Sequence, residues 1–214
     1  MIRAALFDFD GTLADSFAAI TASTNHVRRH FGLPVLTEEA VRGHVGHGLP
    51  HLMSVLVPNA PVEDAVARYR AHHETVMFDL TRLMPDVART IPELAHRGYR
   101  LGVCSNKRVE FTRRLVEALS FGRHIPLVPG PEDVGGRPNP DPLMLLEGVR
   151  RLGVSPFEAV YVGDMDVDVL TGRAAGVPVW LVPGGAVGEN AALAAGPDRV
   201  LRGFGELLDL LPGV

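Results

Sequence analysis

From Asp86 onward the chain alternates between segments with the periodicity of a helix and short apolar segments with the pattern of a strand. The expected helices cover residues 86–97, 109–119, 142–152 and 167–175, and the expected strands cover residues 100–104, 125–128, 159–163 and 178–182. Helices that return the chain to the same edge of a sheet make successive strands parallel. The sequence therefore predicts an α/β fold with a mostly parallel sheet and helices on both of its faces.

A further strand is expected at Ile2–Phe9, which is separated from the alternating part by a helical block. This apolar run stops at Asp10-Gly11-Thr12, a sequence typical of a turn. Helical patterns follow in residues 16–31, 37–45, 49–57 and 62–80, and no strand pattern interrupts them. We therefore expect a core domain of residues 1–15 and 84–214, with a helical domain of residues 16–83 inserted after the first strand.

Composition and charge limit the partners of the chain. The 214 residues carry a formal net charge of -4, and the acidic and basic residues are interspersed. This pattern offers no basic surface for nucleic acid or an anionic membrane, and no apolar window reaches the length of about 18 residues that spans a bilayer. The single cysteine, Cys104, cannot form an internal disulfide. We expect a cytoplasmic, reduced protein, and the sequence leaves a monomer and a homodimer equally open.

Carboxylates follow two of the expected strands. Asp8 and Asp10 lie where the first strand ends, and Asp164 and Asp168 follow the strand over residues 159–163. In an open parallel sheet these strand ends share one edge, where ligands bind. Two carboxylates about 4 Å apart repel by roughly 4 kcal/mol at an effective dielectric constant of 20, so the group needs a cation or a shared proton. Oxygen ligands without His or Cys favour Mg²⁺. The alternative is that each aspartate only caps a turn.

Polar residues with a different chemistry follow the strand over residues 100–104. Ser105 and Asn106 precede a helix, whose N-terminal N–H groups favour an anion. Lys107 comes next, close to the helix start, where the helix dipole disfavours a cation, and this departure from the local rule hints at a function. Arg137 lies in a Pro-rich loop that could direct it toward the same edge. The alternative is that both cations are solvated surface residues.

Taken together, these segments resemble the four motifs of the haloacid dehalogenase superfamily. The first motif is Asp8–Ser16, the second is Ser105-Asn106, the third is Arg137-Pro138, and the fourth is Gly163-Asp164 with Asp168. The resemblance extends over essentially the whole chain. It implies a Rossmann-like core, with the helical insert as the four-helix cap of that superfamily. Within this cap, residues 41–49 resemble the phosphoglycolate phosphatase branch.

The resemblance also implies a role for each carboxylate. Asp8 would be the nucleophile that forms an aspartyl-phosphate, and Asp10 would protonate the leaving alcohol and later activate water. Asp164 would bind Mg²⁺ together with Asp8 and the backbone carbonyl of Asp10, and Asp168 would support the metal site. A carboxylate nucleophile divides a difficult phosphoryl transfer into two easier steps.

The third motif departs from the family pattern. By the same resemblance, Ser105 and Asn106 would hold the phosphoryl oxygens, and a lysine of the third motif would bridge the phosphate and the nucleophile. This chain has Arg137 at that position. Arginine keeps the charge but is longer and planar, so the two residues are not equivalent. Our hypothesis is that either Arg137 or Lys107 supplies the charge.

The expected function is Mg²⁺-dependent hydrolysis of a small phosphorylated metabolite such as 2-phosphoglycolate, with Arg42 and His47 of the cap among the residues that select the leaving group. The alternatives are a phosphosugar mutase or a pyrophosphatase on the same scaffold, and a non-catalytic protein that binds a phosphorylated metabolite. Seven of the nine histidines lie in residues 16–83. We interpret them as surface or cap-lining residues rather than zinc ligands, because Gly46, Gly48 and Pro50 interrupt any single helical face that would carry His44, His47 and His51.

Overall fold

A five-stranded parallel sheet forms the centre of the structure, a computed structural model that describes residues 1–185 and 193–214. The strand order is β4 (Arg100–Val103), β1 (Ala4–Phe7), β5 (Ala159–Gly163), β6 (Val179–Leu181) and β7 (Arg199–Val200). Every neighbouring pair of strands is parallel. The predicted α/β class is confirmed, and the predicted strand over residues 159–163 has the expected bounds.

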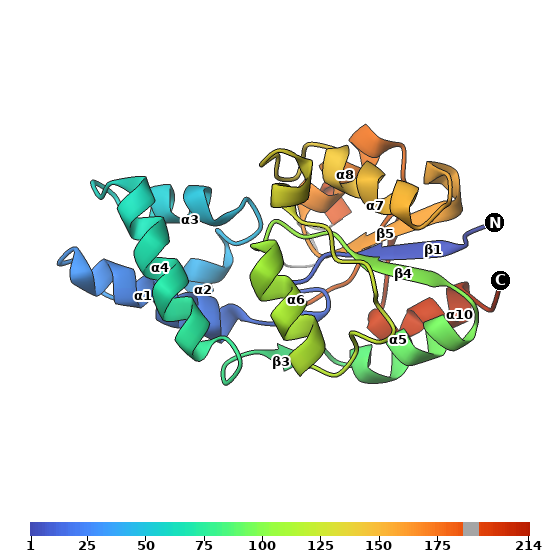
Figure 1. Cartoon of the computed structure of the whole chain (residues 1–214), viewed down its shortest axis with the longest axis horizontal. Coiled ribbons are helices and arrows are strands. Elements are labelled where there is room, and N and C mark those ends of the chain that lie inside the picture. The colour runs from blue at the N-terminus through green and yellow to red at the C-terminus, as the bar shows by residue number, and fades with distance from the viewer. Residues whose placement is uncertain (186–192) are drawn as a thin grey trace.

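Helices cover both faces of the sheet (Figure 1). One face packs against α5 (Val87–His96), α6 (Val109–Ala118) and α10 (Leu207–Leu210), and the other packs against α7 (Leu143–Arg151) and α8 (Asp166–Ala175). Side chains of β1 alternate between the two cores, because successive residues of a strand point to opposite faces. Ala5 and Phe7 belong to the first core, and Ala4 and Leu6 belong to the second. The carboxyl ends of β1, β4 and β5 are thereby held side by side.

Four helices form a separate unit beside the sheet (Figure 1). They are α1 (Phe17–His30), α2 (Glu38–Arg42), α3 (Leu49–Leu56) and α4 (Val62–Val76). This unit has its own apolar core, which includes Phe17, Met53 and Tyr69. Thr37 accepts a hydrogen bond from the Ala40 backbone N–H and caps α2, as expected from a threonine at that position. The expected helix over residues 62–80 ends early, at Val76.

A two-stranded antiparallel ribbon joins the helical unit to the sheet. It pairs β2 (Ala14–Asp15) with β3 (Arg82–Leu83), so the chain enters and leaves the helical unit side by side. The expectation that residues 16–83 contain no strand is therefore wrong at Arg82–Leu83. A strand of two residues has no recognisable period, and its pairing depends on contact with a distant segment.

The expected strand over residues 125–128 is also wrong. Only one bridge forms there, between Leu127 and Gly102, and the Val103 N–H donates to the Leu127 carbonyl over 2.9 Å. Pro126 and Pro129 flank Leu127 and have no N–H to donate, which prevents a continuous ladder. Short 3₁₀ turns complete the described residues: η1 (Pro131–Val134), η2 (Pro156–Glu158) and η3 (Phe204–Glu206).

Within the described ranges, no helix combines the length and the apolar character needed to cross a membrane.

Candidate active site

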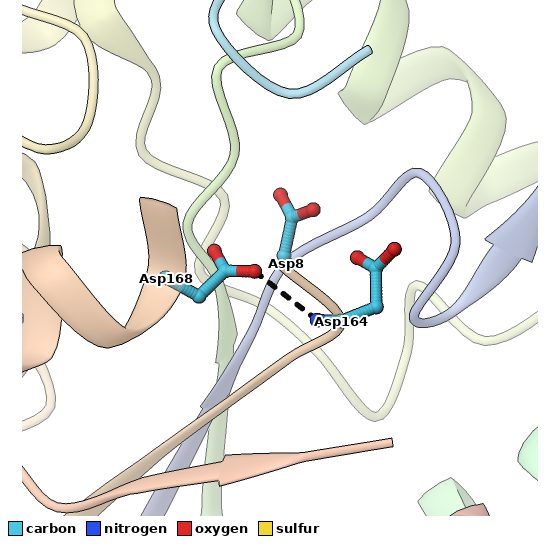
Figure 2. Close-up of side chains that lie close together, drawn as sticks. All are labelled: Asp8, Asp164 and Asp168. Atoms are coloured by element: carbon cyan, nitrogen blue, oxygen red, sulfur yellow. Dashed lines mark hydrogen bonds between the residues drawn. The ribbon is translucent and has the colours of Figure 1, made fainter. Parts of the chain in front are cut away.

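Three buried carboxylates meet at the carboxyl edge of the sheet (Figure 2). Asp8 follows β1, Asp164 follows β5, and Asp168 lies in the first turn of α8. One carboxylate oxygen from each residue lies within 4.8 Å of the others. The expected meeting of Asp8 and Asp164 at one edge is therefore present in the structure. Three oxygen donors this close together could hold a hard divalent cation.

Close packing fixes the position of Asp164. A Cβ atom at Gly11 would lie 2.5 Å from Asp164 Oδ2, and one at Gly185 would lie 2.0 Å from the same oxygen. Since Gly11 also has a φ angle of +90°, glycine fits here for both space and backbone conformation. The Thr12 hydroxyl donates a hydrogen bond to Asp164 Oδ1 over 3.1 Å. The turn after β1 and the loop after β6 thus hold this carboxylate beside Asp8.

Burial and like charge perturb this cluster. Burial raises the pKa of Asp8 well above its usual range, and the charges of Asp168, Asp164 and Asp10 raise it further. A hydrogen bond from the Ser105 hydroxyl opposes this rise. Burial also raises the pKa of Asp168 to about 6. Without a proton or a cation the cluster is electrostatically unfavourable, and a divalent cation would relieve this repulsion.

Asp168 is oriented by hydrogen bonds to both of its oxygens. Asp168 Oδ2 accepts from the backbone N–H groups of Asp164 (Figure 2) and Met165, each over 3.1 Å. Asp168 Oδ1 lies 2.9 Å from the Tyr161 hydroxyl, which is also 2.9 Å from the Cys104 carbonyl. Sequence reasoning missed Tyr161. A tyrosine in the middle of a fully apolar strand was the available signal, because a buried hydroxyl needs a partner.

Asp10 lies beside the carboxylate cluster and has different partners. Its Oδ1 accepts a hydrogen bond from the Ser16 hydroxyl. Lys107 Nζ lies 3.0 Å from Oδ1 and 3.3 Å from Oδ2, so the lysine forms an ion pair with Asp10. The Lys107 backbone N–H donates to the Ser105 hydroxyl over 3.3 Å. The segment after β4 therefore brings a hydroxyl to Asp8 and a cation to Asp10.

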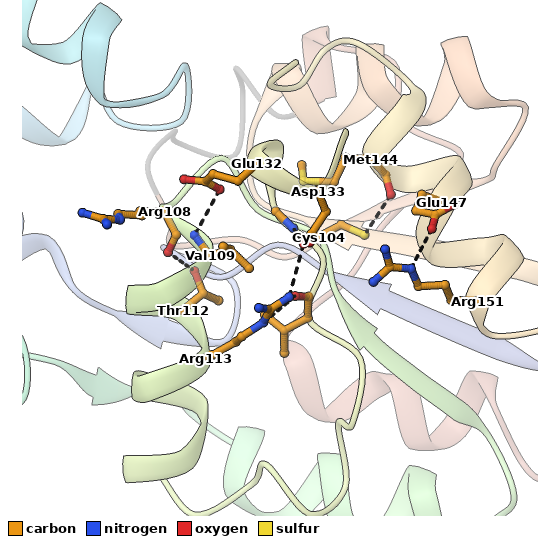
Figure 3. A network of polar contacts seen from close by, with 12 residues as sticks. Cys104, Arg108, Val109, Thr112, Arg113, Glu132, Asp133, Met144, Glu147 and Arg151 are labelled. Atoms are coloured by element: carbon orange, nitrogen blue, oxygen red, sulfur yellow. Dashed lines mark hydrogen bonds and ion pairs between the residues drawn. The ribbon is translucent and has the colours of Figure 1, made fainter. Parts of the chain in front are cut away.

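Arg137 lies outside this group. Its side chain is 62% exposed, and its guanidinium is 3.7 Å from Asp141. The loop that carries it follows η1, which is attached to α6: the Val109 N–H donates to Glu132, and Arg113 donates to Asp133 (Figure 3). Of the two cations considered from the sequence, the structure brings Lys107 to the carboxylates and leaves Arg137 at the surface.

Asn106 connects three segments through its side-chain amide. Its Nδ2 donates to the carbonyls of Gly46 and Asn139 over 2.8 and 3.0 Å, and its Oδ1 accepts from the Asn139 N–H over 2.6 Å. Gly46 belongs to the helical unit, so this residue ties that unit to the sheet. Both amide hydrogens are used in this way. Asn106 lines a cavity between the helical unit and the sheet, but it has no free N–H to direct into that cavity.

A cavity of about 510 Å³ lies between the helical unit and the carboxyl edge of the sheet. Asp8, Asp10, Ser105 and Lys107 line it from the sheet side. The helical unit contributes residues from the segment before α3, from α3 and from α4; they include His47, His51, Tyr69, Arg70 and His73. This volume is typical of a small-molecule site.

The two cap residues expected to select a leaving group have different positions. His47 lines the cavity. Arg42 stacks on the Phe17 ring at 3.8 Å and donates to the Gly185 carbonyl over 3.1 Å, so it connects α2 to the loop beside Asp164. Sequence reasoning included His73 among the surface or cap-lining histidines, but it missed Tyr69 and Arg70, because the sequence does not reveal which face of that helix meets the sheet.

Comparison with known proteins agrees with this geometry. Residues 5–182 match the family described as haloacid dehalogenase-like hydrolase. The phosphoglycolate phosphatase of Escherichia coli is 32% identical over 98% of this chain and 92% of its own length. A plasmid-encoded phosphoglycolate phosphatase of Cupriavidus necator is also 32% identical, over 99% of this chain and 92% of its own length.

Solved structures have the same fold. A haloacid dehalogenase-like hydrolase from Bacteroides fragilis has a TM-score of 0.90 and 30% identity, over 97% of this chain and all 100% of its own. A structure described as a predicted phosphoglycolate phosphatase from Haemophilus somnus has a TM-score of 0.86 and 22% identity, over 98% of this chain and 97% of its own. The chain therefore belongs to the haloacid dehalogenase-like hydrolases, and its expected resemblance to the phosphoglycolate phosphatases within that family is confirmed.

Proposed function

We propose that this chain is a Mg²⁺-dependent phosphatase that hydrolyses a small phosphomonoester such as 2-phosphoglycolate through an aspartyl-phosphate on Asp8. The observation that carries the proposal is the position of Asp8, which lines the cavity and also belongs to the cluster with Asp164 and Asp168. The family and the phosphatases among its relatives support a phosphoric monoester hydrolase.

The carboxylate cluster suits a divalent cation. Three carboxylates supply oxygen donors, which Mg²⁺ prefers, and burial with mutual repulsion disfavours their ionised form when no cation is bound. We propose that Asp8, Asp164 and the backbone carbonyl of Asp10 hold the cation, and that Asp168 orients the Asp164 backbone. When bound, Mg²⁺ would neutralise charge on the phosphoryl group and keep Asp8 ionised.

Asp8 would act as the nucleophile in a reaction of two steps. Its carboxylate oxygen attacks phosphorus and the bond to the leaving alcohol breaks, which leaves phosphate on Asp8. Water then attacks phosphorus, inorganic phosphate leaves, and the Asp8 carboxylate is restored. The Ser105 hydroxyl, which forms a hydrogen bond with Asp8, would contact a phosphoryl oxygen.

Asp10 would move the protons in both steps. It would donate a proton to the leaving alcohol in the first step and accept one from water in the second. The Ser16 hydroxyl and the Lys107 ammonium both contact its carboxylate and fix its orientation. We propose that Lys107, rather than Arg137, also supplies the positive charge beside the transferred phosphoryl group.

Residues 16–83 would serve as a cap domain over this chemistry. The cavity is bounded on one side by this helical unit, and the hydrogen bond from Asn106 to the Gly46 carbonyl links the unit to the segment that carries Ser105. A closed cap would exclude water from the first step and admit only a small substrate.

The test is release of inorganic phosphate from a panel of phosphoesters with Mg²⁺ present. The panel contains 2-phosphoglycolate, other small phosphomonoesters, a phosphosugar and pyrophosphate, and each is assayed with wild type and Asp8→Asn. The proposal expects hydrolysis of a small monoester by wild type and none by the variant. Binding without turnover in wild type would instead indicate a non-catalytic binder, and preferred turnover of pyrophosphate or isomerisation of the phosphosugar would indicate one of the other enzymes.

A further inference from the structure

The α4 side of the cavity carries a cation that the proposed chemistry does not use. Tyr69, Arg70 and His73 line the cavity from α4, and Asp8 and Asp10 line it from the sheet side. Asp8 and Asp10 mark the end of the cavity where the phosphoryl group reacts. Groups on α4 line the same cavity from the helical unit, so they are in a position to contact the leaving group of the substrate.

Arg70 has no protein partner among the residues that the structure describes. It forms no ion pair and no hydrogen bond there. The residue is partly exposed, but its Nε atom is buried without an acceptor. The Nε atom of the neighbouring Arg68 is also buried without a hydrogen-bond acceptor, but the Arg68 guanidinium forms an ion pair with Asp64 over 2.9 Å. A cation in a cavity wall without an ion-pair partner is available to an anionic ligand, and the buried Nε–H is a donor that such a ligand can satisfy.

The acidic residues of the cavity are already engaged with other groups. Asp10 pairs with Lys107, and Glu132 accepts from the Val109 N–H. Asp8 belongs to the carboxylate cluster. Of the cavity's carboxylates in the described chain, none contacts Arg70, which leaves this guanidinium available to an anion from outside the protein.

The neighbours of Arg70 on α4 are neutral. Burial lowers the pKa of His73 to about 2, and the charge of Lys107 contributes to this decrease. His73 Nδ1 lies 3.1 Å from the Ser23 hydroxyl, whose proton is directed to the Ala19 carbonyl over 2.9 Å. Burial also raises the pKa of Tyr69, with Asp10 adding to the effect. Arg70 is therefore the fixed positive charge on this wall.

We propose that Arg70 binds the carboxylate of the substrate's leaving group, so that the enzyme selects phosphate esters of short hydroxy acids over esters of uncharged alcohols. This inference rests on the proposed phosphatase function. A guanidinium suits a carboxylate because its planar fork can donate two parallel hydrogen bonds. A site built for such a contact disfavours a substrate that lacks it, since the cation is then left without a partner.

The experiment compares two substrates in three proteins. The values of kcat/KM for 2-phosphoglycolate and for ethyl phosphate, which lacks the carboxylate, are measured with wild type, Arg70→Gln and the matched control Arg68→Gln. Arg70→Gln should lower kcat/KM for 2-phosphoglycolate by about tenfold to a hundredfold and leave that for ethyl phosphate within about threefold, because a hydrogen bond to a charged group contributes on this scale. The ratio of the two values should be unchanged in Arg68→Gln.

The inference would be overturned if Arg70→Gln left the ratio of the two kcat/KM values unchanged, whether both values decreased equally or neither changed. A binding measurement separates it from the proposed function. In the Asp8→Asn background with Mg²⁺ present, calorimetry should find that Arg70→Gln weakens binding of 2-phosphoglycolate but not of ethyl phosphate. If wild type hydrolyses neither ester and this binding difference remains, the proposed function fails and the assignment of Arg70 stands. If hydrolysis occurs without the difference, the assignment fails and the function stands.

Discussion

The Lys107 ammonium lies 3.0 and 3.3 Å from the two carboxylate oxygens of Asp10, and the two side chains are only 6% and 12% exposed. An ion pair this deep in a cavity is screened little by solvent, in contrast to the exposed contact between Arg137 and Asp141. This position supports the proposal that Lys107, rather than Arg137, supplies the cation beside the phosphoryl group.

Replacement of Lys107 is expected to impair turnover. Lys107→Met keeps the length of the side chain but removes its charge, so kcat/KM for the preferred phosphomonoester should decrease by about tenfold or more. Arg137→Met is the matched control and should stay within about threefold. Steady-state phosphate release measures both. A tenfold loss in the Arg137 variant with none in the Lys107 variant would reverse our assignment.

Asp8→Asn is expected to separate activity from stability. Phosphate release should decrease by at least about a thousandfold, because the nucleophile is lost. In metal-free buffer at pH 7 the variant should be more stable than wild type. Because the pKa of Asp8 is raised in the folded chain, the folded chain binds this proton more tightly than the unfolded chain. The stabilisation that the bound proton provides is therefore lost as the pH rises from the pKa of Asp8 in the unfolded chain through its pKa in the folded chain.

Thermal unfolding in metal-free buffer measures the second effect, with Tm expected to rise by a few degrees at about 2–4 °C per kcal/mol for a chain of this size. A lower Tm in Asp8→Asn would show that the repulsion in the cluster is already relieved without a cation.

Removal of divalent cations is expected to affect both activity and stability. Chelation should abolish phosphate release. Adding Mg²⁺ at about 100 times its Kd should stabilise the folded chain by about 2.7 kcal/mol, because binding to the folded state alone shifts the unfolding equilibrium. Asp164→Asn removes one charged oxygen ligand, so it should reduce both the Mg²⁺-dependent release of phosphate and the stabilisation of the folded chain by Mg²⁺. Activity that survives exhaustive chelation, with no change of Tm on adding Mg²⁺, would contradict the metal site.

The stability of the helical unit is expected to depend on pH through His73. The pKa of His73 in the folded chain is lowered from 6.5 to about 2. Below pH 6.5 the unfolded chain therefore binds a proton at His73 that the folded chain does not bind. Stability should therefore decrease as the pH falls, by about 2 kcal/mol between pH 8 and pH 5 for this group.

Urea unfolding of wild type and His73→Asn at both pH values measures this contribution, because asparagine can keep a donor toward Ser23 but does not titrate. The same substitution at the exposed His96 provides the control. If His73→Asn lost as much stability on acidification as wild type does, the desolvated histidine would not be the cause.

The local pattern of the sequence was sufficient to predict the sheet and the meeting of two of its strand ends. The strand over residues 159–163 has its predicted bounds, and Asp8 and Asp164 come together because parallel strands end at a common edge. Two short stretches were predicted wrongly, at residues 82–83 and 125–128, and the two-residue strands β2 and β7 were not predicted. Pairing with a distant segment decides whether such short stretches become strands, and neither stretch carries that information in its own residues.

Sequence alone determined the fold class, the family resemblance and the carboxylates at the strand ends, since these depend on short-range periodicity and on motifs of adjacent residues. Only the tertiary structure decided that Lys107 rather than Arg137 contacts Asp10, that Tyr161 orients Asp168, and that Arg70 rather than Arg42 faces the cavity. The physical reason is that the direction of a side chain depends on how its helix or loop packs against residues far away in the chain. Asp10 and Lys107 are separated by 97 positions and meet only because β1 and β4 lie side by side.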